Sequence, residues 1–231
     1  MILQSHEAFF TIIHEDNHLI VVNKRNGVPS QGDQSGDTPL TEHVKEYLKE
    51  TYNKPGNVFT GLVHRIDRPV SGIVVLAKTS KALERMNKIF HDREVKKTYY
   101  AIVKNKPENP EGKLIHWLIK DGSRNVTKAH KKEVPNGLRS ELDYKLIASL
   151  ENYYLLEINP ITGRSHQIRS QLAAIGSPIK GDVKYGFDRT NKDGSICLHA
   201  RKISFLHPVS KEPVEFTADM PDSDIWGKFE L

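Results

Sequence analysis

Short apolar runs that end at Gly, Pro, Asn or Asp recur along this chain, and they constrain its fold more than any other feature. A run of this length between turn residues favours a buried strand. Such runs predict strands over residues 18–24 and 74–77, and alternation predicts one over 97–103. Residues 140–144, 153–158, 196–198 and 214–218 look like further strands. Helical patterns fall between them at irregular intervals. The sequence thus predicts an α+β fold rather than a regularly alternating α/β fold.

Three segments are predicted to be helical. In the first, Leu and Val recur every four residues after Pro39, and Thr38 is placed to cap the helix. In the second, Thr79 or Ser80 can cap a helix whose apolar face carries Leu83, Met86, Ile89 and Phe90. The third covers residues 167–174.

Length and composition narrow the class of protein. We expect one domain over residues 1–231, because no linker is long enough to separate two. A net charge of +5 favours a polyanionic partner, with nucleic acid first, although solubility alone can explain it. The N-terminus lacks the pattern of a signal peptide, and no apolar segment is long enough to span a membrane. The single cysteine, Cys197, is expected to be a small buried hydrophobe. We expect a cytoplasmic protein.

Residues 61–76 read GLVHRIDRPVSGIVVL and place one carboxylate between two cations. Asp67 lies between Arg65 and Arg68, immediately before an apolar run. Nearby positive charge favours the ionised form of a carboxylate, which a nucleophile or base needs. An exposed salt bridge in a loop is the alternative interpretation of this segment alone.

This segment resembles the catalytic loop of the RluA family of pseudouridine synthases, with Ile66 in place of the family's Leu. Residues 95–103, VKKTYYAIV, resemble the family's Lys-x-Tyr-x-Ala-x-Val strand. Residues 160–169, PITGRSHQIR, resemble its Gly-Arg-x-His-Gln-Ile-Arg motif, and residues 178–186, 198–200 and 207–208 resemble its C-terminal part. One departure is Lys24-Arg25, where the family usually has Lys-Pro. The resemblance covers nearly the whole chain.

The resemblance implies a pseudouridine synthase fold, in which flanking helices and a mixed, mostly antiparallel sheet surround a central active-site cleft. It also implies an enzyme that isomerises specific uridines to pseudouridine in tRNA or rRNA, as a monomer. The family uses no cofactor and no metal. The sequence agrees, because it has no phosphate-binding Gly-rich motif and no Cys-His cluster. Many relatives carry an N-terminal S4-type RNA-binding domain, and none is expected before Ile12.

The same resemblance assigns roles to individual residues. Asp67 is the expected catalytic nucleophile, and Tyr99 is expected to lie against the flipped base. Arg169 is the preferred partner for Asp67, with Arg164 as the competing candidate that instead binds phosphate or fixes its loop. Arg65 is expected to point toward RNA. Whether Asp67 attacks C1′ or C6, or triggers elimination, stays open.

The remaining candidates are contacts to RNA. His64, His166 and Gln167 are expected at the substrate, although both histidines are equally compatible with supporting their own loops. Candidate phosphate contacts are Lys96, Lys97, Lys128, Lys131 and Lys132. Residues 114–136 form either an RNA-facing hairpin or a solvated one.

Two other functions are weighed against catalysis on uridine. A non-catalytic RNA-binding or RNA-chaperone protein of the same fold would tolerate loss of Asp67, Tyr99 or Arg169, and all three are present. A glycoside hydrolase needs a pair of carboxyl groups. The motifs here surround one carboxylate with cations and offer no evident second acid, so isomerisation is preferred.

Overall fold

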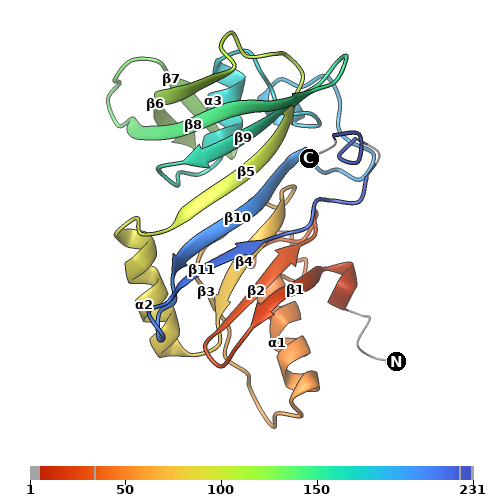
Figure 1. The fold of residues 1–231 in the computed structure, drawn as a ribbon, viewed down its shortest axis with the longest axis vertical. Helices are drawn as coiled ribbons and strands as arrows, with labels where there is room; N and C mark the ends of the chain where they lie inside the picture. The colour runs from red at the N-terminus through yellow and green to blue at the C-terminus, as the bar shows by residue number, and fades with distance from the viewer. Residues whose placement is uncertain (1–5, 34, 224, 230–231) are drawn as a thin grey trace. The chain divides into compact units, whose positions relative to one another are not determined.

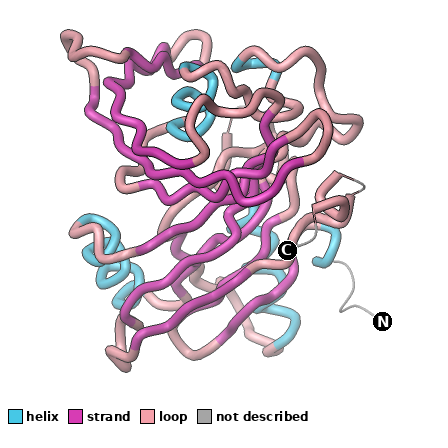
Figure 2. Tube along the Cα trace, turned by 45° about the horizontal axis from the view of Figure 1, so that its top comes forward, coloured by secondary structure: helices cyan, strands magenta, loops and turns pink. Residues whose placement is uncertain are grey.

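The structure, a computed structural model, describes residues 6–33, 35–223 and 225–229. The chain divides into two compact units. The first combines the chain up to Lys96 with Ala200–Pro221, and the second combines Lys97–His199 with the residues that follow Pro221. Strands make up most of the regular structure in both (Figures 1 and 2). The expected single domain over residues 1–231 stays a prediction.

The first unit is a sheet with one helix on each side. Its strands run in the order β1-β2-β4-β10, with β3 paired to β4 and β11 paired to β10. The pairs β1/β2, β2/β4, β3/β4 and β10/β11 are antiparallel. The strands are β1 (Phe10–Glu15), β2 (Leu19–Lys24), β3 (Gly61–Leu62), β4 (Ser71–Ala77), β10 (Leu198–Leu206) and β11 (Pro213–Thr217). A short 3-10 helix, η1 (His6–Ala8), precedes β1.

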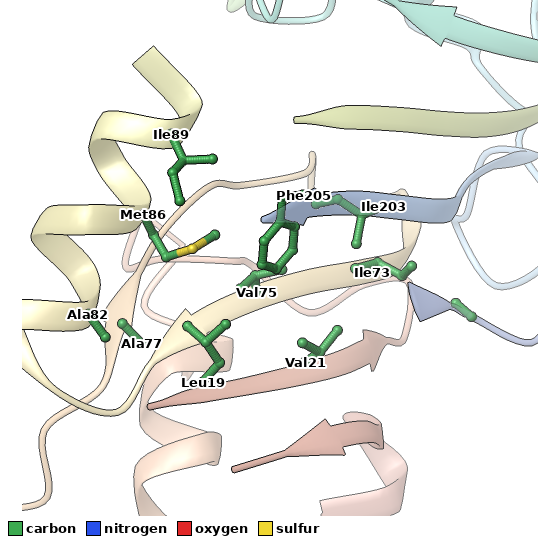
Figure 3. Packing of buried hydrophobic residues seen from close by; sticks show 11 residues of the cluster. Leu19, Val21, Ile73, Val75, Ala77, Ala82, Met86, Ile89, Ile203 and Phe205 are labelled. Atoms are coloured by element: carbon green, nitrogen blue, oxygen red, sulfur yellow. The ribbon is translucent and has the colours of Figure 1, made fainter. Parts of the chain in front are cut away.

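The core of this unit covers both faces of β2 and β4. On one face, Leu19, Val21 and Val75 pack against helix α2 (Ser80–His91), which contributes Met86 and Ile89 (Figure 3). The alternate strand residues are buried as well, and so is the apolar face of α1 (Leu40–Thr51). Figure 1 places α1 beside β1 and β2. Two-sided burial explains why these strands read as continuous apolar runs.

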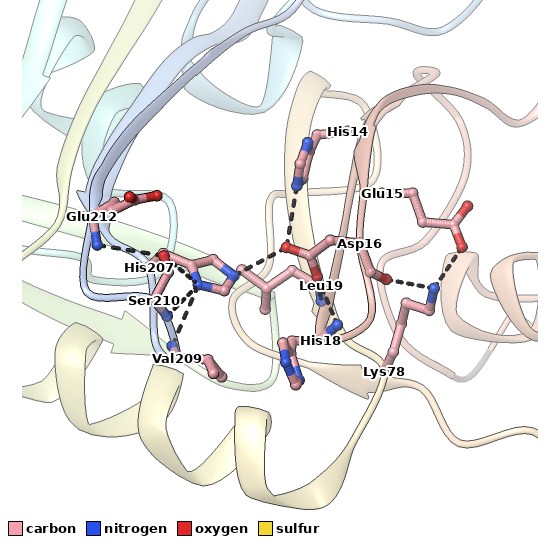
Figure 4. Close-up of polar contacts among 10 residues, drawn as sticks. All are labelled: His14, Glu15, Asp16, His18, Leu19, Lys78, His207, Val209, Ser210 and Glu212. Carbon is pink, nitrogen blue, oxygen red and sulfur yellow. Dashed lines mark hydrogen bonds and ion pairs between the residues drawn. The ribbon is translucent and has the colours of Figure 1, made fainter.

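A polar cluster joins the turn between β1 and β2 to the turn between β10 and β11 (Figure 4). The Asp16 carboxylate accepts the amide N–H groups of His18 and Leu19 at 2.6 and 2.7 Å. It also lies 3.0 Å from Nε2 of His207. The other ring nitrogen of His207 accepts amide N–H groups from Val209 and Ser210. The two amides hold the His207 ring with Nε2 facing the Asp16 carboxylate.

The second unit is a five-stranded antiparallel sheet in the order β5-β9-β8-β6-β7. Helix α3 (Gln167–Ala174) packs on one face, where the buried Gln171 amide donates to the Leu114 carbonyl and contacts Nδ1 of His116. Figure 1 shows α3 next to β6 and β8. The strands are β5 (Lys96–Val103), β6 (Glu111–Asp121), β7 (Val126–His130), β8 (Leu138–Ser149) and β9 (Tyr154–Pro160), and a 3-10 helix η2 covers Val183–Tyr185.

The predicted elements are largely confirmed, with two corrections. Thr38 does not cap the first helix, because the N-cap residue is Pro39 and no side chain caps it. Ile196 and Cys197 are buried but lie outside any strand, and β10 begins at Leu198. Burial alone produced the apolar pattern there. Of the two candidate caps for the second helix, Thr79 is the one that caps it, since Thr79 accepts the Ala82 N–H at 3.2 Å. Strand β1 was not predicted, because its sequence FTIIHE mixes polar and apolar residues.

Candidate active site

Asp67 lies on a loop between β3 and β4 that the first unit holds at several points. Ser30 Oγ donates to the Ile66 carbonyl at 2.8 Å and accepts the Ile66 N–H at 3.3 Å. The Asp67 carbonyl accepts the Val70 N–H at 3.0 Å and closes a tight turn. Ile66 and Val70, on either side of Asp67, are buried. The half-buried Asp67 side chain therefore sits on a loop with buried anchors on both sides.

Lys24 braces the same loop from the interior. Its side chain is fully buried, and Nζ donates to the carbonyls of Arg25, Val28 and Arg68 at 2.9, 2.8 and 3.3 Å. Three carbonyls match the three donors of an ammonium group. Burial lowers the pKa of Lys24 to about 7, the negative charge of Asp67 opposes that shift, and Arg68 adds to it. The loop thus has a buried cation that attracts the Asp67 carboxylate.

Among the neighbours of Asp67 in the sequence, one histidine supports the loop and two arginines are exposed. His64 accepts the Val75 N–H on Nε2 at 3.1 Å, and its ring stacks on Phe90 with centroids 5.0 Å apart. His64 therefore supports the loop, and its contact with substrate stays a prediction. Arg65 is exposed. Arg68 is also exposed and pairs with Asp37, on the segment that precedes α1.

Tyr99 lies on β5 of the second unit, half-buried and opposite Ile158 of β9. Tyr100 is its neighbour on the strand and therefore points to the opposite face. Lys97, two residues before Tyr99, has its pKa lowered by burial. A Cβ atom built on Gly163 would lie 3.5 Å from Lys97 Nζ. The lysine of the Tyr99 strand and the Gly-Arg motif therefore meet in this unit.

Gln167 holds the loop that carries Arg164. Its Oε1 accepts the Thr162 hydroxyl at 2.8 Å and the Arg164 N–H at 3.0 Å, and its Nε2 donates to the Glu141 carbonyl at 2.9 Å. Gln167 is buried, whereas Arg164 is exposed. The structure gives Gln167 a bracing role, and its expected contact with substrate stays a prediction.

Arg169 is buried on α3 and makes a two-point ion pair with Asp182. Nε and Nη2 lie 2.7 and 2.8 Å from the two carboxylate oxygens. The guanidinium also lies over the Tyr185 ring, 4.9 Å from its centroid. A two-point pair of this kind fixes the plane of the guanidinium. The expected pairing of Arg169 with Asp67 stays a prediction.

His166 extends this network at the start of α3. Its Nδ1 lies 2.8 Å from the Tyr185 hydroxyl, which accepts the Thr127 N–H at 2.8 Å. The Tyr185 hydroxyl therefore links β7 to the start of α3. His166 has a left-handed backbone with φ of 51°, which is uncommon outside glycine. The contact with Tyr185 shows that His166 supports its own motif. Its expected contact with substrate stays a prediction.

Comparison with known proteins decides the family. The family model for RNA pseudouridylate synthase matches residues 18–174. The chain is 33% identical to the dual-specificity RNA pseudouridine synthase RluA of Haemophilus influenzae, over 92% of this chain and 94% of that protein. The chain belongs to the RNA pseudouridylate synthase family.

Other relatives of the family are longer. The chain is 35% identical to the ribosomal large subunit pseudouridine synthase C of Vibrio vulnificus, covers 90% of its own length in that match and spans 65% of that relative. The human RNA pseudouridylate synthase domain containing 4 has the same fold, with a TM-score of 0.75 at 23% identity over 91% of this chain and 88% of that one. The predicted RluA resemblance and α+β pseudouridine synthase fold are therefore confirmed.

Two residues of the RNA pseudouridylate synthase motifs acquire partners that the sequence did not indicate. In the sequence, Lys24 stands at the end of a predicted strand, and Asp182 lies in a segment that resembles the family's C-terminal part. A lysine that ends an apolar run is a signal for a buried amine, but lysine is rarely buried and the signal is weak. An isolated aspartate in a loop carries no signal for pairing with Arg169.

Within residues 6–33, 35–223 and 225–229, no helix is long and apolar enough to cross a membrane. Over those residues, no three His, Cys, Asp or Glu side chains are grouped to hold a metal ion.

Proposed function

We propose that this chain isomerises uridine to pseudouridine in structured RNA, with Asp67 as the nucleophile. The main support for this proposal is the Asp67 loop. Its sequence matches the family, and Ser30 and the buried Lys24 brace its backbone. A carboxylate on a braced backbone, near the buried Lys24 amine, suits nucleophilic attack, because the loop needs little reorganisation to present it to the reacting carbon.

The reaction breaks the bond between uracil N1 and ribose C1′ and forms a bond between C5 and C1′. C5 releases one proton and N1 takes up another, so atoms and electrons balance without a cofactor. In this proposal Tyr99 stacks on the flipped base and Arg169 pairs with Asp67. Arg65, Arg164, His64, His166 and Gln167 surround the substrate directly or through their loops.

The target is proposed to be a uridine in a stem-loop of tRNA or rRNA. Flipping costs least for a base that is already unpaired, which favours a loop. The resemblance to a ribosomal large subunit synthase and to a dual-specificity RNA synthase supports RNA as the substrate, with ribosomal RNA among the proposed targets. We further propose that the protein works in the cytoplasm as a monomer.

The test is tritium release from RNA labelled at uridine C5. Bulk tRNA and ribosomal RNA, each from cells that lack this protein, are incubated separately with wild type, Asp67→Ala and Asp67→Asn. We expect wild type to release tritium and both variants to fall by at least about 10³-fold. Asp188→Asn is the matched control, because Asp188 is exposed and pairs only with Lys104 among the described residues.

Product analysis separates the alternatives. Isomerised nucleoside supports a synthase, whereas free uracil indicates a hydrolase. Unchanged RNA with intact binding indicates the RNA-binding or chaperone protein. Equal tritium release by wild type and Asp67→Ala would remove Asp67 from the mechanism.

A further inference from the structure

The face of the second unit that α3 leaves open carries an apolar stripe along β6. Residues alternate between faces of a strand, and His116 points to α3. Ile115, Trp117 and Ile119 therefore point away from α3. Ile115 is 37% exposed and Trp117 is half-buried, so neither is enclosed by the unit. Among the described residues, no aromatic ring or cation stacks on the Trp117 indole.

Cations border this stripe on both sides. Trp117 lies opposite His130 of β7 and Arg139 of β8, and Ile119 lies opposite Lys128. Residues 117–139 contain six Lys or Arg and two Asp or Glu, a net +4 of the whole chain's +5. Arg139 pairs with Glu141, while Lys128, Lys131 and Lys132 are exposed and form no ion pair within the described residues.

The stripe is fixed to the motif that carries Arg164. The Thr127 N–H on β7 donates to the Tyr185 hydroxyl, which also contacts His166. On β8, the Glu141 carbonyl accepts the Gln167 amide. A ligand on this face would therefore be held in a set position relative to the Arg164 loop.

We propose that Trp117 and the cations around it form a second RNA contact, in which an unpaired base stacks on the indole and phosphates meet Lys128, Lys131 and Lys132. The inference rests on the proposed function, since it takes RNA as the substrate. Aromatic side chains within a basic surface bind single-stranded nucleic acid by this combination of stacking and phosphate contact. A second copy of the chain fits poorly, because two surfaces of net +4 repel each other.

Tryptophan fluorescence reports the contact directly. The chain has two tryptophans, and Trp226 is buried at 5% exposure. An RNA stem-loop with a uridine-rich loop is titrated into wild type, Trp117→Phe and Trp117→Ala. We expect the RNA to quench wild-type fluorescence and to leave Trp117→Phe unquenched. Trp117→Ala should weaken binding by about 5- to 150-fold, and Trp117→Phe by less, because Phe still offers a stacking surface.

The salt dependence of binding tests the lysines. Replacing Lys128, Lys131 and Lys132 by Gln should lower the slope of log Kd against log salt by about 0.7 for each lost phosphate contact. The matched control replaces Lys49, Lys106 and Lys192, which are exposed elsewhere, and should keep the wild-type slope. In turnover, Trp117→Ala and the triple lysine variant should raise KM and leave kcat unchanged. This is expected for a contact made equally in the ground and transition states.

The outcomes separate this inference from the proposed function. Suppose that wild type forms pseudouridine, and that fluorescence quenching, Kd and salt slope are the same in wild type and every variant. The proposed RNA contact at Trp117 is then wrong, and the proposed function stands. If wild type forms no pseudouridine but RNA quenches the fluorescence of Trp117, the proposed RNA contact stands and the proposed function fails. If Trp117 fluorescence is quenched without RNA as the protein concentration rises, and the protein forms dimers in solution, the face belongs to a second copy of the chain. That result would overturn the inference.

Discussion

At the scale of single residues, the buried amine of Lys24 sets the position of the Asp67 loop. Its three acceptor carbonyls come from both the β2 turn and the Arg68 backbone. Lys24→Met would leave three carbonyls without their donor, and unsatisfied buried polar groups are costly. We expect a loss of about 2–4 kcal/mol in the free energy of unfolding, measured in urea. Lys104→Met, at an exposed ion pair, should change it by less than about 1 kcal/mol.

The pH dependence of that difference reports the charge state of Lys24. Its pKa is about 7 in the folded chain and about 10.4 in an unfolded one. Between these values the unfolded chain binds more protons, so wild-type stability rises with pH. The stability gap between wild type and Lys24→Met should therefore widen from pH 7 to pH 9. A constant gap would mean that the three carbonyl bonds keep the ammonium charged throughout this range.

At the scale of elements, helix α2 starts at a side-chain cap. Thr79 accepts the Ala82 N–H, one of the amides that a helix start leaves unpaired. Thr79→Ala should lower the free energy of unfolding by about 1 kcal/mol. The adjacent Ser80→Ala should leave it nearly unchanged, because Ser80 is exposed inside the first turn. A larger loss in Ser80→Ala than in Thr79→Ala, by thermal or urea unfolding, would reverse the assignment.

The elements show how far sequence pattern reaches. Strand β4 and helix α2 were predictable, because a Gly-bounded apolar run and an apolar face at helical spacing are distinctive. The start of β10 was not, because Ile196 and Cys197 are buried without strand pairing. Gly72 is a further case: its φ is +114°, and a Cβ there would lie 2.4 Å from the Ala200 carbonyl oxygen. Pattern indicates burial, whereas such close approaches depend on a strand distant in the sequence.

The candidate site divides in the same way. Motif resemblance placed Asp67, Tyr99 and Arg169 on the loop, strand and helix where the structure has them. It did not indicate that Gln167 and His64 bind their own loops, since a side chain's partner depends on the neighbours that folding brings near. The Asp182 partner of Arg169 was missed for the same reason.

At the scale of the whole molecule, residues near both ends of the sequence close the first unit. Asp16 joins the β1–β2 turn to His207, which lies beyond the whole second unit in the sequence. Burial acts to raise the pKa of Asp16, but the amides of Leu19 and His18 outweigh it, and the pKa is lowered. A carboxyl with a lowered pKa stabilises the fold above its unfolded pKa, and that stability is lost as pH falls through the folded value.

Acid titration of stability tests this closure. Wild type should lose stability as pH falls below about 4, and Asp16→Asn should show a shallower loss, since an amide keeps an acceptor for the turn but does not titrate. At pH 7 Asp16→Asn should already be less stable, because the charge facing His207 is gone. Asp222→Asn, at an exposed position, is the control and should follow wild type. Parallel acid profiles for wild type and Asp16→Asn would mean that the unit closes through its apolar core, with Leu19, Ile203 and Phe205 sufficient to hold the two ends of the chain together.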